Sequence, residues 1–118
     1  MRVWLYARLS NDDDREMNSL LNQREICQAF AEQHGYTIVG QSYDDNASGM
    51  NFNRRGLDKL TAAVDADMID AVIVKDLSRL GRHKTQTALF IDYLRERQVR
   101  VISATEGVDT FRDEDDLI

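Results

Sequence analysis

Short apolar runs alternate with longer amphipathic segments along this 118-residue chain, and this alternation constrains the fold more than any other feature. The runs have the length and the β-branched or aromatic content of strands, and they cover residues 3–7, 36–43, 69–74 and 99–103. The segments between them have helical composition or periodicity, at about 15–34, 56–66 and 85–97. Strands that alternate with helices predict an α/β fold: a mainly parallel, open sheet of four to five strands, with helices on both faces.

The ends of the first helix can be read from its flanking residues. Gly35 supplies the residue expected just after a helix C-terminus. At the other end, Asp13 with Glu16 could form a capping pair, and Ser19 offers a competing start. The sequence therefore leaves two positions open for the first turn.

Composition indicates a single globular domain rather than a disordered chain, with 42% hydrophobic and 31% charged residues. No apolar run approaches the roughly 18 residues needed to span a bilayer. A single cysteine, Cys27, excludes an internal disulfide framework, and with no export signal it favours a cytoplasmic protein. Cys27 and the two histidines, His34 and His83, form no recognisable zinc-binding spacing.

The distribution of charge tells more than the net charge of −6. Residues 109–118 hold five acidic residues and one basic residue, whereas residues 75–84 hold four basic residues and one acidic residue. An acidic protein can therefore still carry a focused cationic site. The overall charge is weak evidence against DNA binding by this chain alone.

The residues whose side chains could bind a ligand or catalyse a reaction follow the predicted strands. Arg8 and Ser10 follow the first strand, the loop 44–55 follows the second, and residues 75–82 follow the third. The carboxyl ends of parallel strands meet at one edge of a sheet, where ligands bind in α/β folds. We therefore expect these segments to form one site.

Arg8 and Ser10 lie two apart, so on a strand their side chains share a face. A guanidinium beside a hydroxyl suits attack on an anionic ester such as a phosphate. The simpler interpretation is that Ser10 helps to start the next helix and that Arg8 neutralises nearby acids.

Two further arginines, Arg79 and Arg82, lie three apart, and one helical turn would bring both guanidiniums to one side. Such a pair can hold the oxygens of a phosphoryl centre, although a solvated basic turn would look the same in sequence. Arg54, in the loop after the second strand, could add another guanidinium to the site.

Other polar residues have both a functional and a structural interpretation. Oxygen atoms from Asp44, Asp45 and Asn46 could bind a divalent metal, but adjacent aspartates more often cap turns. Gln23 shares the apolar face of its helix with Cys27, so it either approaches the loop after the first strand or lies at the rim of the core. Cys27 itself is expected to be a small buried hydrophobic residue.

As a set, these segments resemble the catalytic domain of the serine recombinases, the resolvase and invertase enzymes together with the large serine integrases and transposases. The motifs that carry the resemblance span the chain in order, and they are Tyr6-Ala7-Arg8-Leu9-Ser10, Ser19 with Gln23, Ser48-Gly49 with Arg54, Gly56-Leu57, and Leu77-Ser78-Arg79-Leu80-Gly81-Arg82. The details at Asp44-Asp45 and at residues 75–78 are similar to the large, mobile-element branch. The resemblance implies a resolvase-like fold.

The resemblance also implies a mechanism. Ser10 would be the nucleophile, attacking a DNA phosphodiester to leave a 5′-phosphoserine link and a free 3′-OH. Four arginines would bind the scissile phosphate, with Gln23 assisting, and these are Arg8, Arg54, Arg79 and Arg82. No metal, nucleotide or other cofactor is implied.

The chain departs from the small resolvases at one position of this motif. They commonly carry an aspartate where this chain has Ser78. Asp76 lies nearby in sequence, but it is expected to point in a different direction, so the role of that carboxylate is not transferred to it.

By the same resemblance, residues 1–110 are the catalytic domain, and residues 111–118 are an acidic end that leads to missing C-terminal regions. Those regions would supply most of the affinity for double-stranded DNA, and the full-length protein would act as a homodimer or tetramer. The 118-residue chain alone is expected not to recombine DNA.

Two other functions fit the same fold class. One is a non-catalytic module for oligomerisation or regulation, which would not require Ser10 and all four arginines. The other is a phosphoacceptor receiver-like domain, with Asp76 as acceptor and Asp12-Asp13 as the acidic pair. The receiver interpretation leaves the arginines unexplained.

Overall fold

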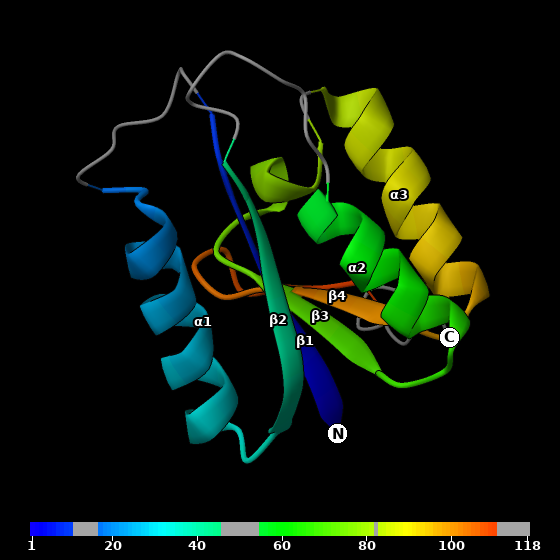
Figure 1. Cartoon of the computed structure of the whole chain (residues 1–118), viewed down its shortest axis with the longest axis horizontal. Helices are drawn as coiled ribbons and strands as arrows, with labels where there is room; N and C mark the ends of the chain where they lie inside the picture. Colours follow the sequence, from blue (N-terminus) through cyan, green and yellow to red (C-terminus); the bar gives the residue numbers. More distant parts are fainter. Residues whose placement is uncertain (11–16, 46–54, 82, 111–118) are drawn as a thin grey trace.

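The computed structural model describes residues 1–10, 17–45, 55–81 and 83–110 of the chain. They form a five-stranded sheet, three α-helices and one short 3-10 helix. Figure 1 shows how these elements are arranged. In chain order the elements are β1 (Arg2–Leu9), α1 (Leu20–Gln33), β2 (Thr37–Asp45), α2 (Arg55–Asp65), β3 (Ala71–Val74), η1 (Leu77–Leu80), α3 (Lys84–Glu96), β4 (Arg100–Ser103) and β5 (Val108–Asp109). The predicted α/β class is confirmed.

The sheet is open and mostly parallel, with the strand order β2-β1-β3-β4-β5. The strands β2, β1, β3 and β4 pair in parallel, and β5 runs antiparallel to β4. Helix α1 covers one face of the sheet, and α2 and α3 cover the other (Figure 1). This arrangement confirms the prediction of helices on both faces.

Alternation along the strands builds a separate hydrophobic core under each helical layer. Beneath α2 and α3, the strands contribute Tyr6, Val72, Val74 and Val101. Beneath α1, they contribute Val3, Leu5, Ala71, Ile73 and Ile102, which pack with Cys27 and Ala31 of the helix. Both faces of the central strands are therefore apolar, which is why these strands read as continuous apolar runs.

Strand β1 extends well beyond its neighbour β3. It pairs with β2 along its whole length, from Arg2 to Leu9, but with β3 only over Val3–Leu5. On the β3 side, the backbone of the last part of β1 must therefore find other hydrogen-bond partners, because a buried amide is costly to leave unpaired. This requirement shapes the site described below.

Helix α1 begins later than the sequence pattern suggested. Its first residue is Leu20 rather than a residue near 15, and residues 17–19 are not helical. The hydroxyl of Ser19 accepts the backbone N–H of Asn22 at 3.0 Å, so Ser19 is the N-cap. The alternative capping pair, Asp13 and Glu16, lies outside the described residues.

Residues 79–81 do not form a helical turn, and Arg82, at the end of the turn considered from sequence, lies outside the described residues. Helix η1 ends at Leu80, α3 begins at Lys84, and Gly81 between them is extended, with φ −168° and ψ 159°. Gly81 packs against α3, where an added Cβ would lie 3.0 Å from the Cβ of Gln86. The chain therefore leaves the 3-10 helix directly after Arg79-Leu80 instead of continuing as one helix.

Among the helices in the described part of the chain, none has both the length and the apolar character needed to cross a membrane.

Candidate active site

Arg8 fastens the end of β1 to η1 through its side chain. Its guanidinium donates from Nε to the carbonyl of Arg79 at 3.1 Å, and from Nη2 to the carbonyls of Ser78 at 2.6 Å and Gly81 at 3.4 Å. The residue is only 5% exposed. Carbonyl oxygens at the end of a helix carry partial negative charge, so they stabilise this buried cation.

Arg79 makes the reciprocal contact. Its Nη1 donates to the carbonyl oxygen of Arg8 at 2.7 Å, and Arg79 is 6% exposed. Each arginine therefore binds the backbone of the other, which fixes η1 beside the end of β1. Ser10, half-buried, follows β1 directly and lies two residues after Arg8.

Gln23 of α1 pairs with the backbone of Arg8 as a neighbouring strand would. Its Oε1 accepts the N–H of Arg8 at 3.1 Å, and its Nε2 donates to the carbonyl of Arg8 at 2.9 Å and to that of Asn18 at 2.8 Å. The side chain is fully buried. Of the two interpretations of Gln23, the structure supports the one that brings it to the end of the first strand.

Asp76 was expected to point in a different direction from the residue at position 78, but both side chains contact Arg79. Oδ1 of Asp76 lies 3.3 Å from Nε of Arg79, and it also accepts the backbone N–H of Ser78 at 3.1 Å. The hydroxyl of Ser78 donates to the same oxygen. The reason is the local backbone: Asp76 is the extended N-cap of a tight 3-10 turn, and this turn brings residues 76 and 79 together.

Lys75 is a residue of this region that the sequence interpretation did not single out. Its Nζ donates to the carbonyl of Met17 at 2.6 Å and to the side-chain oxygens of Asn18 at 2.7 Å and Asn22 at 3.3 Å. It therefore binds the start of α1 to the end of β3. Its position directly after a buried strand was the signal that could have identified it.

The structure thus gathers four of the six predicted site residues at the carboxyl end of β1. Gln23 and Arg79 are each hydrogen-bonded to the backbone of Arg8, and Ser10 follows two residues later in the chain. Arg54 and Arg82 lie outside the described residues, as do Asn46, Asp12 and Asp13. A hydroxyl two residues along the chain from a buried, permanently charged guanidinium has the chemistry needed for attack on an anionic ester.

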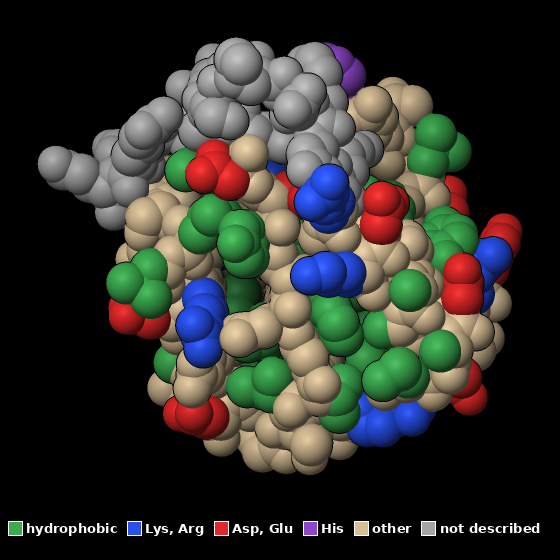
Figure 2. Space-filling view, viewed as in Figure 1, with side chains coloured by type: hydrophobic (Ala, Val, Ile, Leu, Met, Phe, Trp, Pro, Cys, Tyr) green, Lys and Arg blue, Asp and Glu red, His purple; other side chains and the backbone are tan. Residues whose placement is uncertain are grey.

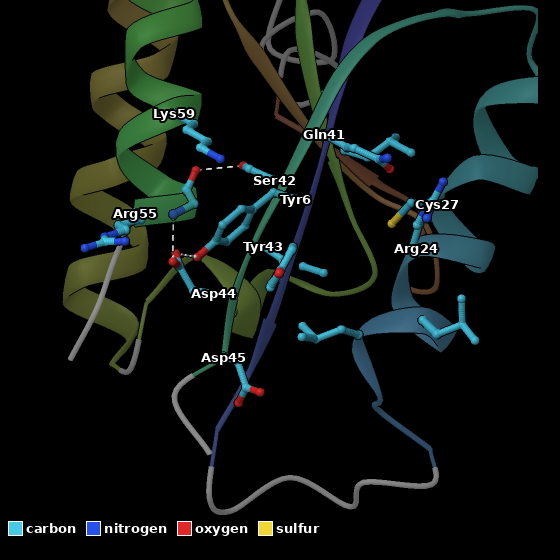
Figure 3. Close-up of a pocket in the computed structure, with 15 residues that line it drawn as sticks. Tyr6, Arg24, Cys27, Gln41, Ser42, Tyr43, Asp44, Asp45, Arg55 and Lys59 are labelled. Atoms are coloured by element: carbon cyan, nitrogen blue, oxygen red, sulfur yellow. Dashed lines mark hydrogen bonds between the residues drawn. The ribbon is translucent and has the colours of Figure 1, made fainter. Parts of the chain in front are cut away.

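Asp44 has a structural function at the end of β2. Its carboxylate accepts the N–H of Gly56 at 2.7 Å, the N–H of Leu57 at 3.0 Å and the hydroxyl of Tyr6 at 2.6 Å, as Figure 3 shows in part. It therefore caps α2, the more common of the two functions considered for it. Among the described residues, no cluster of three or more histidine, cysteine or acidic side chains could hold a metal ion.

A cavity of about 910 Å³ opens around the edge strand β2. Arg55 and Lys59 lie on one side of the strand, and Arg24 and Cys27 lie on the other (Figure 3). In Figure 2, hydrophobic side chains line a hollow beside α1. None of the four gathered site residues is among the described residues that line this cavity, so it is a feature separate from the candidate site.

Cys27 is a core residue, as expected. It is 1% exposed, and burial, with a smaller contribution from the charge of Asp76, raises the pKa of its thiol to about 12. At neutral pH the thiol is therefore protonated and has no nucleophilic character.

Comparisons with known proteins agree with this arrangement. The family described as "Resolvase, N terminal domain" matches residues 3–118. The chain is 29% identical over 105 residues to the DNA-invertases of Escherichia phage P1 and Enterobacteria phage P7. These matches cover 89% of this chain and 50% of each invertase, so the chain spans about half the length of these relatives.

Solved structures show the same similarity. A resolvase family site-specific recombinase from Streptococcus pneumoniae has a TM-score of 0.80 and 28% identity, covering 92% of this chain and 75% of that one. The C-terminal catalytic domain of ISC1926 TnpA, an IS607-like serine recombinase, has a TM-score of 0.72 and 29% identity, covering 88% and 70%. The N-terminal catalytic domain of TP901-1 integrase shares the fold, with a TM-score of 0.77 and 24% identity over 93% and 82%.

The family match favours the recombinase interpretation over the receiver-like one. It covers nearly the whole chain, and the fold agrees with it. The chain belongs to the resolvase N-terminal domain family, the catalytic domain family of the site-specific serine recombinases.

Proposed function

We propose that this chain is the catalytic domain of a site-specific DNA recombinase and that Ser10 is its nucleophile. The Ser10 hydroxyl gives up its proton as its oxygen attacks the phosphorus of a DNA phosphodiester. A 5′-phosphoserine bond forms, the bond from phosphorus to the 3′ oxygen breaks, and that oxygen takes up a proton. Attack by a 3′-OH on the phosphoserine reverses the step after strand exchange, so the covalent link conserves the bond energy without metal or ATP.

The observation that carries this proposal is the buried Arg79 guanidinium bonded to the backbone of Arg8, two residues before Ser10. Negative charge that develops on a phosphoryl group is best stabilised by fixed, permanently charged donors. We assign this function to Arg8 and Arg79, and also to Arg54 and Arg82. Gln23 assists by holding the backbone of Arg8.

In this proposal residues 1–110 form the catalytic unit, and residues 111–118 lead to regions that supply most of the affinity for double-stranded DNA. The protein exchanges strands as a homodimer or tetramer, and the 118-residue chain alone does not recombine DNA. The reaction takes place in the cytosol, a reducing compartment in which the single thiol of Cys27 remains unpaired.

The test is to trap the covalent intermediate. The protein is expressed from its complete reading frame and incubated with linear duplexes tiled across the DNA on either side of its gene. We expect a protein–DNA adduct that survives detergent and disappears after protease digestion. Mass spectrometry of the digested adduct should place the nucleotide on Ser10.

Ser10→Ala should abolish the adduct, whereas the matched control Thr37→Ala should retain it, because Thr37 is an exposed hydroxyl at the opposite end of the sheet. An adduct that persists in Ser10→Ala would refute Ser10 as the nucleophile. A wild-type protein that folds but forms no adduct on any duplex would support the non-catalytic module instead.

A further inference from the structure

The carboxylate of Asp76 and the hydroxyl of Ser78 form a connected pair beside Arg79. Ser78 donates its hydroxyl proton to Oδ1 of Asp76, and the same hydroxyl oxygen accepts from Nη2 of Arg79 at 2.9 Å and from Nε at 3.2 Å. Asp76 Oδ1 also contacts Nε directly, at 3.3 Å. One edge of the guanidinium is therefore held by both residues.

The opposite part of the same guanidinium is held by β1, through the bond from Nη1 to the carbonyl of Arg8. Contacts from two directions define the plane of the group. The side chain of Arg79 is 7% exposed and that of Asp76 is 24% exposed, so water screens this pair far less than a surface pair. A buried guanidinium also needs a nearby negative charge to offset its lost hydration.

We propose that Asp76, acting with Ser78, is a positioning residue that sets the orientation of Arg79 for the phosphoryl chemistry at Ser10. This inference rests on the proposed function. Asp76 acts through Arg79 and does not exchange a proton with the DNA. A guanidinium that is already oriented loses less free energy to reorganisation when charge develops on the phosphate.

The competing explanation is that Asp76 only caps η1 by accepting the N–H of Ser78. Three variants separate the two. Asp76→Asn keeps a good capping acceptor but removes the negative charge. Ser78→Ala keeps the cap and removes the hydroxyl link. Combining Asp76→Asn with Ser78→Asp returns a carboxylate at the position where the Ser78 oxygen already lies within 3.2 Å of two Arg79 nitrogens.

The first measurement needs no DNA. In the ¹⁵N-labelled chain, the Nε–H signal of Arg79 is assigned by its loss in Arg79→Lys, and its hydrogen exchange is then followed. We expect exchange to be faster in Asp76→Asn by about tenfold or more, since one charge-assisted hydrogen bond is lost. Ser78→Ala should also speed exchange, and the combined variant should restore the wild-type rate. Asp92→Asn, which breaks a surface pair with Arg95, is the control and should leave the signal unchanged.

The second measurement is the single-turnover rate of adduct formation at saturating DNA, with DNA affinity measured separately. We expect Asp76→Asn to slow adduct formation about tenfold with little change in affinity, because an orienting contact is lost while the four arginines remain. The combined variant should recover most of the rate. A cap alone predicts wild-type rates and an unchanged Arg79 signal in Asp76→Asn, and that result would overturn the proposal.

The two measurements separate the failure of this inference from the failure of the proposed function. If the wild-type protein forms no adduct, the proposed reaction is wrong, and the exchange data still decide whether Asp76 orients Arg79. If the adduct forms and Asp76→Asn loses rate, but returning the carboxylate restores the Arg79 signal without the rate, then Asp76 does not act through Arg79.

Discussion

The arginines at the two ends of the sheet differ in burial and in hydrogen-bond partners. At the amino end, Arg2 pairs with Asp70 through contacts of 3.1 and 3.3 Å, and both side chains remain more than two-fifths exposed. At the carboxyl end, Arg8 and Arg79 are nearly buried, and the bonds described for them go mainly to backbone carbonyls and to the Ser78 hydroxyl. The amino end holds Arg2 by a solvated ion pair, whereas the carboxyl end holds Arg8 and Arg79 by buried bonds to the backbone and, for Arg79, by a largely buried pair with Asp76.

This difference determines how accurately each guanidinium is placed. An exposed ion pair exchanges with water at little cost, so its geometry is weakly defined and its contribution to stability is small. A buried guanidinium must keep its partners, because a buried N–H that loses its acceptor has no water to replace it and destabilises the fold. The carboxyl end therefore holds its cations in fixed positions, as the proposed catalytic site requires.

Replacing Arg8 with methionine should cause the largest loss of stability. Methionine keeps the apolar stem of the side chain but removes the donor shared by the carbonyls of Ser78, Arg79 and Gly81. We expect the free energy of unfolding, measured by urea denaturation near neutral pH, to fall by about 3 kcal/mol. The control is Arg2→Met at the amino end, which should cost much less. If the two variants lost equal free energy of unfolding, the proposed difference between the two ends of the sheet would be wrong.

Gln23→Met should have the next largest effect, since it unpairs the N–H and carbonyl of Arg8 within the core. The expected loss in the free energy of unfolding is about 2 kcal/mol. Gln28→Met is the matched control, because Gln28 lies exposed on the same helix and contacts only the side chain of Glu32 among the bonds described for it. If both variants unfold at the same urea concentration, the hydrogen bonds from the Gln23 amide to the backbone of Arg8 do not stabilise the fold.

Asp44→Asn should cost about 1 kcal/mol, the usual contribution of a helix cap. An asparagine has one oxygen, so it cannot accept from both Gly56 and Leu57 as the carboxylate does. Faster amide hydrogen exchange at those two residues would report the loss directly. Asp58→Asn, in the first turn of the same helix, loses only its favourable interaction with the helix dipole. A larger effect at Asp58 than at Asp44 would contradict the capping function.

Asp70→Asn should have the smallest effect, and its effect should depend on pH. Hydrogen bonds from Arg2 lower the pKa of Asp70 below its ordinary value of 3.8. The unfolded chain therefore binds this proton more readily than the native one, so the stabilisation is present above that value and is lost as the pH falls below it. Urea titrations of both proteins across this range should converge at low pH, and added salt should shrink the difference near neutrality. If the difference in the free energy of unfolding between the two proteins grew as the pH fell, the pKa of Asp70 would be raised rather than lowered in the native state.

The sequence predicted which strand ends come together, but not how their side chains are oriented. Apolar periodicity located β1 and β3, and parallel pairing then put Arg8, Ser10 and Arg79 at one edge. The partners of Arg8 could not be read in the same way, because they depend on β1 extending past the end of β3. That mismatch is set by the register of two strands far apart in the chain.

Asp76 shows the same limit at a smaller scale. Its spacing to Arg79 permits contact in a 3-10 turn, whereas the helical turn expected across 79–82 assumed a different backbone. The structure forms the 3-10 turn over Leu77–Leu80, and the extended Gly81 that follows ends it. Gln23 is an unusual polar residue on an apolar helix face, and the sequence shows this. Its two bonds to Arg8 could not be predicted, because they depend on how α1 packs against β1.

The interlocked contacts around Arg8 also bear on when the protein can become active. They join residues that lie 15 and 71 positions apart in the chain, so no single segment contains them. During synthesis, Ser10 emerges long before Arg79 does. If the proposed function is correct, a nascent or partly unfolded chain carries the nucleophile without the Arg79 guanidinium assigned to its reaction, so we expect no attack on DNA until folding has reached η1.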